Sequence, residues 1–151
     1  MPLHPEGRAR ILEQLQQIAS GKPCKVVEIG RLTDQQFDAL CRLKRELGHP
    51  LPGSPELVYD GRHHYKGRVV KDGYQITDLL LQIEAALASS STIEIEKHMT
   101  AVVSASLRND GYGNMVRDRV ILELQQRKPR GEVYSAIPKG DRGGPKKQQG
   151  P

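Results

Sequence analysis

Apolar residues recur at helical spacing in three stretches of the first ninety residues. Within each stretch most of them fall three, four or seven residues apart, which places them on one face of a helix. They are Ile11, Leu15 and Ile18; Phe37, Leu40 and Leu47; and Ile76, Leu79, Leu80, Ile83 and Leu87. Thr33 and Gln36 have the spacing of a capping box that begins the second helix. Gly21 follows the first stretch and is predicted to end that helix.

Beyond residue 90 the apolar period changes to two, which is typical of half-buried strands. The predicted strands are 99–107, 116–124 and 133–137, with short extended pieces at 24–29 and 56–59. Asn109-Asp110-Gly111 indicates a hairpin turn. This order of elements, with helices first and an antiparallel meander after them, is typical of an α+β fold. We therefore expect N-terminal helices packed on a small antiparallel sheet formed by the C-terminal half.

The chain has 151 residues, which is the size of one domain. Its formal net charge is +5. Residues 1–126 hold equal numbers of basic and acidic side chains, so the whole excess of basic side chains lies in the last 25 residues. Residues 140–151 have no apolar side chain and cannot offset the entropy of their own ordering. We expect one domain over 1–138 and a disordered basic Gly/Pro/Lys tail over 139–151, which either solubilises the chain or tethers a polyanion.

Several classes of protein are disfavoured by composition. No apolar run approaches the roughly 20 residues that span a bilayer, and no apolar signal-peptide stretch is present at the N-terminus. Cys24 and Cys41 are too few and too far apart for a disulfide framework or a four-ligand zinc site. We therefore expect a cytoplasmic protein with no membrane partner, no metal and no cofactor.

The most informative segment for chemistry is Gly61 to Tyr74, whose centre is predicted to be a short helix ended by Asp72-Gly73. It holds the adjacent histidines His63 and His64 together with several cations. Four residues separate His64 from Arg68, so the two share a helix face. Histidine transfers protons near neutral pH, and guanidinium stabilises charge on a phosphoryl group. The pattern suits RNA cleavage, a helix-capping role on a solvated basic face, or ligand binding without catalysis.

Arg117, Arg119 and Ser135 are the candidates on the predicted strands. Two residues separate the arginines, so both guanidinium groups lie over one surface and can grip a phosphate or pair with acidic neighbours. Ser135 has a hydroxyl that can contact a scissile phosphate or serve as an ordinary strand serine.

Two runs of sequence, LVYDGRHHYKGRVVKDGYQITDLLLQIEAAL and VRDRVILELQQRKPRGEVYSAIPKGD, resemble phage-associated and toxin domains of the barnase/EndoU/colicin/RelE-like ribonuclease superfamily. The resemblance covers roughly residues 24–141 and lies in the order of parts, two helices and then a twisted antiparallel sheet. It implies metal-independent RNA cleavage. His63 or His64 with Arg68 would match the early basic pair, and Arg117 and Ser135 the phosphate contacts on the sheet.

Three hypotheses for function follow. The first is a ribonuclease-like toxin or phage-encoded effector that cleaves RNA with His63, His64, Arg68, Arg117 and Ser135, and that has a cognate inhibitor as a partner. The alternative is a non-catalytic inhibitor, adaptor or immunity-like protein that binds another protein. The third is a regulator that binds nucleic acid through its basic tail.

Overall fold

The α+β class is confirmed. A computed structural model describes residues 2–97, 99–124 and 131–140, and the predicted tail beyond residue 140 lies outside them. The helical elements are α1 (Pro5–Ala19), α2 (Asp34–Glu46), α3 (Arg62–Tyr65), the π-helical segment η1 (Lys66–Lys71) and α4 (Ile76–Ala86). The strands are β1 (Val27–Arg31), β2 (Glu56–Tyr59), β3 (Thr92–Glu96), β4 (Met99–Val103), β5 (Arg108–Asn109), β6 (Met115–Val116), β7 (Arg119–Leu124) and β8 (Gly131–Ala136).

Six of these strands form one sheet in the order β1-β2-β8-β7-β4-β3, while β5 and β6 form a separate hairpin. All pairings in the six-stranded sheet are antiparallel except the parallel pair β2 and β8. The sheet is larger than expected, because β1 and β2 from the N-terminal half extend it beyond β8. Strand β2 supplies Leu57, Val58 and Tyr59, all buried, which a strand in the interior of the sheet requires.

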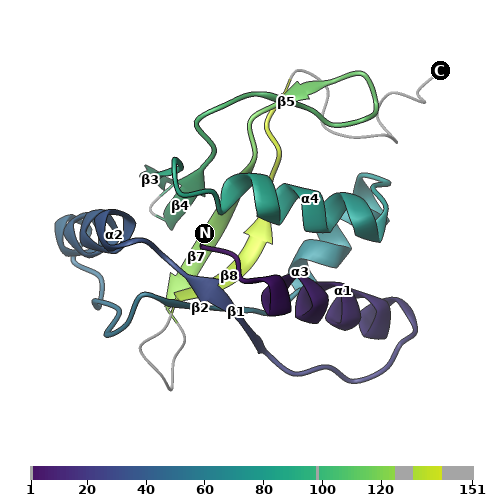
Figure 1. The fold of residues 1–151 in the computed structure, drawn as a ribbon, viewed down its shortest axis with the longest axis horizontal. Helices are drawn as coiled ribbons and strands as arrows, with labels where there is room; N and C mark the ends of the chain where they lie inside the picture. The colour runs from purple at the N-terminus through teal and green to yellow at the C-terminus, as the bar shows by residue number, and fades with distance from the viewer. Residues whose placement is uncertain (1, 98, 125–130, 141–151) are drawn as a thin grey trace.

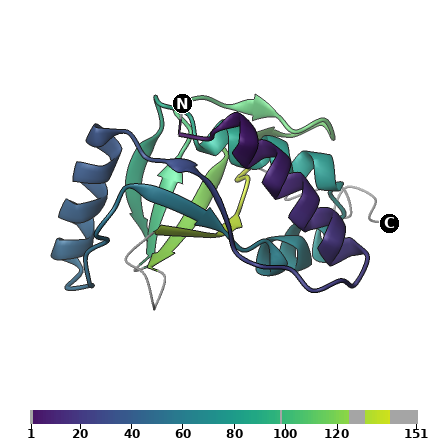
Figure 2. The same cartoon turned by 60° about the horizontal axis from the view of Figure 1, so that its bottom comes forward.

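The helices form two groups around the sheet (Figures 1 and 2). Helices α1, α3 and α4 contact one another and pack against β1, β7 and β8, whereas α2 lies apart from them beside β3 and β4. The capping box of Thr33 and Gln36 is confirmed at the start of α2. Both helix groups and the sheet contribute to one hydrophobic core, whose side chains include Ile11, Leu15, Leu40, Tyr59, Leu79, Ile83, Leu87 and Leu122.

The predicted strand over 116–124 is interrupted. Val116 belongs to the hairpin strand β6, and β7 begins at Arg119. Between them, Asp118 is buried and accepts two hydrogen bonds from the guanidinium of Arg108, at 2.8 and 2.9 Å. The backbone of Arg117 pairs with that of Lys139, so the described part of the predicted tail begins against the domain.

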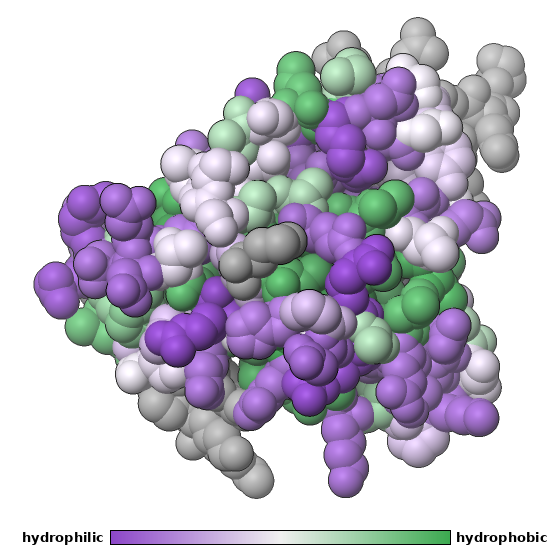
Figure 3. All heavy atoms as spheres, viewed as in Figure 1, coloured by the Kyte–Doolittle hydropathy of each residue, from purple (hydrophilic) through white to green (hydrophobic). Residues whose placement is uncertain are grey.

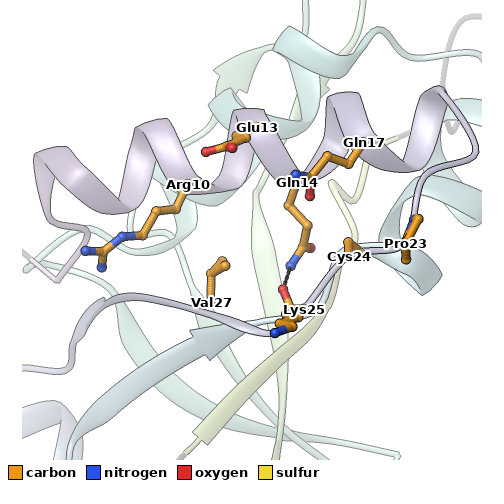
Figure 4. A pocket seen from close by; sticks show the side chains of 8 residues that line it. All are labelled: Arg10, Glu13, Gln14, Gln17, Pro23, Cys24, Lys25 and Val27. Atoms are coloured by element: carbon orange, nitrogen blue, oxygen red, sulfur yellow. Dashed lines mark hydrogen bonds between the residues drawn. The ribbon is translucent and has the colours of Figure 1, made fainter.

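Gln14 is a buried polar side chain that ties α1 to three other parts of the chain. Its Nε2 donates to the carbonyl oxygens of Lys25, at 2.6 Å, and Tyr59, at 3.1 Å. Its Oε1 accepts from the backbone N–H of Gly61 at 2.6 Å. Figure 4 shows the side chain reaching down from α1 to the segment that leads into β1. One amide thus fixes α1 against the end of β2, where α3 begins.

We expect Gln14→Ala to lower the free energy of unfolding by about 2–3 kcal/mol, because it leaves the Gly61 N–H and two carbonyls without their partner. Gln16→Ala is the matched control, since Gln16 is exposed on the same helix. Urea unfolding of both variants measures the difference. Equal stability of the two would show that this amide does not hold the elements together.

Candidate functional site

His64 points into the core and is completely buried, with 0% of its surface exposed. Its Nδ1 lies 2.7 Å from the hydroxyl of Tyr59, and its Nε2 lies 3.0 Å from Oε1 of Gln82. Because an amide oxygen only accepts, Nε2 carries the proton and Tyr59 donates to Nδ1. Both ring nitrogens are therefore occupied by side chains of the protein.

The same surroundings keep His64 uncharged. Burial lowers the pKa of His64 to about 3 and outweighs the opposing effect of the hydrogen bond to Gln82, while the charges of Arg68 and His63 lower it further. The sequence placed His64 and Arg68 together at a surface. The structure instead gives His64 the role of a neutral link between β2, α3 and α4, without access to a substrate.

His63, the neighbouring residue, is exposed and faces β8. Its ring stacks on that of Tyr134, with centroids 4.3 Å apart and an angle of 20° between the planes. The Tyr134 hydroxyl lies 3.1 Å from Nδ1 of His63. Tyr134 falls at a β-bulge, because Ile121 pairs with Ser135 and the next residue, Leu122, pairs with Val133. A β-bulge changes the direction of a side chain, and at this bulge the Tyr134 ring lies against the imidazole of His63.

A cavity of about 210 Å³ lies farther along the same two segments. Arg68, Lys71, Asp72 and Tyr74 line it from η1 and the turn after it, and residues 137–140 line it from the continuation of β8. Three cations, Arg68, Lys71 and Lys139, surround it with one carboxylate, Asp72, whose Oδ2 lies 3.2 Å from Nε of Arg68. The predicted helix ended by Asp72-Gly73 is confirmed, although its second half is π-helical, a form often found at functional sites.

We name this region the α3–β8 seam. It consists of His63 and Tyr134 at one end and of Arg68, Lys71 and Lys139 around the cavity at the other. The seam therefore carries a proton-transfer group and a cluster of cations on the same two segments of the chain.

A pair of Asp-Gly-Tyr triplets, at 72–74 and 110–112, supports the cavity and was not recognised from the sequence. The rings of Tyr74 and Tyr112 meet edge to face at 5.6 Å, and both glycines have φ of +87°. The hydroxyl of Tyr74 donates to Asp110 at 3.0 Å. Burial opposes ionisation of Asp110, but hydrogen bonds from Asn114, from the Tyr112 backbone and from Tyr74 hold its pKa below the ordinary value. The repeated triplet was the signal available in the sequence.

Arg117 and Ser135 occupy positions different from those expected. The Arg117 guanidinium donates to the Ser104 carbonyl at 2.9 Å, and its backbone holds Lys139 beside the cavity. Arg119 forms an ion pair with Glu96 across the sheet, which is the pairing considered as the alternative to phosphate binding. Ser135 is only 5% exposed and lies opposite Ile121. The structure thus brings Arg68 and the backbone of Arg117 to one region, and it buries His64 and Ser135.

None of the protein-family models, curated proteins or solved structures compared with this chain matches it. Within the described ranges, no helix combines the length and apolarity needed to cross a membrane. No three His, Cys, Asp or Glu side chains in the same ranges are grouped so as to hold a metal ion.

The burial of His64 predicts a dependence of stability on pH. Its folded pKa of about 3 lies below the roughly 6.5 of an unfolded chain, so between these values the unfolded state binds the extra proton. The free energy of unfolding therefore decreases as the pH is lowered, by about 1.4 kcal/mol for each pH unit below 6.5. Between pH 7 and 5 we expect His64 to contribute a loss of about 2 kcal/mol.

Urea unfolding of wild type, His64→Gln and His49→Gln at both pH values measures this contribution. We expect His64→Gln to be less stable at pH 7 but to lose less stability on acidification than wild type. His49 is exposed in a loop, so His49→Gln should keep the wild-type dependence. The same pH dependence in all three proteins would contradict a neutral buried imidazole.

Proposed function

We propose that this chain is a metal-independent endoribonuclease that binds RNA along the α3–β8 seam. The observation that carries the proposal is the exposed imidazole of His63, held by the Tyr134 phenol, on the same two segments as a cavity with three cations. This is the chemistry implied by the resemblance to the barnase/EndoU/colicin/RelE-like superfamily. His63, rather than His64, is the group that exchanges protons with the substrate.

The charge needed for RNA binding is concentrated at the seam. The body of the chain is neutral overall, but Arg68, Lys71 and Lys139 meet around one cavity. Gly140 also lines this cavity, and the sequence after it contains Arg142, Lys146 and Lys147. Phosphate contacts supply most of the affinity of proteins for nucleic acids, so a local cluster of this kind can bind a strand that the neutral body does not attract.

The His63–Tyr134 pair can complete the transfer of protons in RNA cleavage. When Nδ1–H donates to the Tyr134 oxygen, Nε2 has a free lone pair and takes the proton of a ribose 2′-hydroxyl. The 2′ oxygen then forms a bond to phosphorus, and the bond from phosphorus to the 5′ oxygen breaks. Tyr134 donates its hydroxyl proton to the leaving oxygen and regains one from Nδ1. The products are a 2′,3′-cyclic phosphate and a 5′-hydroxyl.

The other predicted residues have supporting roles in this proposal. His64 fixes the orientation of α3 from within the core, so it positions His63 without touching RNA. Arg68 binds phosphate in the cavity, and Arg117 holds the Lys139 segment in place through its backbone. Ser135 is a strand residue and has no part in the reaction.

We expect His63→Gln to lower kcat/KM for cleavage of a single-stranded RNA by about 100-fold or more, because general acid–base catalysis is lost. His49→Gln is the control for removal of an exposed histidine elsewhere. A labelled RNA and its 2′-deoxy counterpart are incubated with each protein and the products are separated by size. Undiminished cleavage by His63→Gln, cleavage of the 2′-deoxy strand, or an inactive wild type would refute the proposal.

Lys139→Gln should weaken RNA binding and reduce the slope of log affinity against log salt by about 0.7, the value for one phosphate contact on a single strand. Lys22→Gln removes an exposed lysine just after α1, outside the cavity lining, and should change neither quantity. Fluorescence anisotropy with the non-cleavable 2′-deoxy strand at several salt concentrations provides the measurement. Identical slopes for the two variants would place the bound strand away from the cavity.

A further inference from the structure

A second cavity, of about 450 Å³, lies between α2 and the loop that joins α4 to β3. Its volume is within the range of small-molecule sites. Strands β7 and β4 lie between β3 and β8, which are therefore about 14 Å apart in the sheet, and the cavity shares no lining residue with the seam. Figure 3 shows weakly polar side chains gathered beside the hydrophilic surface of α2 in this part of the molecule. The lining residues are Gln35, Gln36, Ala39, Arg42 and the run Ser89 to Ile93.

Ser91 is a buried member of this lining whose hydroxyl lacks a partner among the described residues. It is only 4% exposed, and its Oγ forms no hydrogen bond with any described residue. A buried hydroxyl without a partner costs about 1–3 kcal/mol, and in native proteins such a group usually has a reason to be there. Ser91 belongs to the wall of a cavity, but its Oγ is itself buried, so a bound molecule supplies the missing partner once the side chain rotates toward the cavity.

Hydrogen bonds from the side chain of Gln36 hold the loop that contains Ser91. The Nε2 of Gln36 donates to the carbonyl oxygens of Ala88, at 2.9 Å, and Ser91, at 3.0 Å. Its Oε1 accepts from the backbone of Thr33 in the capping box at the start of α2. The wall is therefore fixed before any ligand binds, which reduces the entropy lost on binding.

The charge of the lining is suited to an anion. Arg42 is exposed at the cavity and forms no ion pair with a carboxylate in the described ranges. No acidic residue is among the lining residues, whereas four of them carry hydroxyl groups, Ser89, Ser90, Ser91 and Thr92. A guanidinium with several hydroxyl and amide groups can bind a phosphate and the polar body attached to it.

We propose that this cavity is a binding site for a small phosphomonoester with a hydrogen-bonding body, such as a sugar phosphate or a nucleoside monophosphate. Arg42 binds the phosphate. Ser91 Oγ and the neighbouring hydroxyls bind the polar body, and Ala39 and Ile93 supply an apolar surface. The proposal is independent of RNA cleavage at the seam.

Amide NMR titrations with inorganic phosphate, ribose 5-phosphate and adenosine 5′-monophosphate test the proposal. We expect saturable shifts in α2 and residues 89–93, and tighter binding of at least one of the two esters than of inorganic phosphate. Arg42→Gln should weaken ester binding at least 10-fold. Arg45→Gln, which removes an exposed arginine of α2 outside the cavity lining, should leave it unchanged.

Ser91→Ala separates ligand binding from a structural role. Because it removes a hydroxyl without a partner, the free protein should melt at the same or a higher temperature, while ester affinity falls about 5-fold. Absence of saturable shifts at millimolar ester, or equal binding by the Arg42 and Arg45 variants, would overturn the proposal. Shifts confined to the seam and abolished by Lys139→Gln would overturn this site too, while leaving the proposed seam in place.

Discussion

The arrangement of the seam depends on the neutral imidazole of His64, clamped between Tyr59 and Gln82. These two hydrogen bonds join the end of β2, the first turn of α3 and the middle of α4. Successive residues of a helix are rotated by about 100°, so burying His64 turns His63 out toward Tyr134. The same short helix leads into η1 and so carries Arg68 to the cavity. The direction of both groups is therefore set by a side chain that does not meet the solvent.

Local patterns predicted the fold class and most of the elements. The Thr33–Gln36 capping box and the strand at 56–59 are both found as the sequence indicated, because each depends on a few neighbouring residues. The parallel pairing of β2 with β8 was not predicted. It joins Leu57 to Gly131, more than seventy residues away, and no short-range pattern encodes such a contact. The position of Arg117 was difficult to predict for a related reason. The predicted strand over 116–124 is interrupted before Arg119, where Asp118 forms an ion pair with Arg108.

The candidate site was predicted only in outline. The sequence identified the segment around His63 and His64, but it could not show which imidazole is buried, since this depends on Tyr59 and Gln82. Lys139 was counted with a disordered tail, although its backbone pairs with Arg117 at the cavity. Nothing in the sequence indicated that the hydroxyl of Ser91 is buried, because the serines of a serine-rich loop are ordinarily exposed to solvent. Residues of this kind are recognised only when burial and hydrogen bonding are known together.

The two adjacent histidines have different roles in the proposed site, and NMR of their ring nitrogens tests that difference most directly. The protein would be titrated with a 2′-deoxy oligonucleotide, which under the proposed function occupies the seam without reacting. The ring nitrogens of His63 should shift as the strand binds, while those of His64 stay at the values of a neutral ring protonated on Nε2. Shifts at His64 with His63 unaffected, or a charged His64 at neutral pH, would contradict the account.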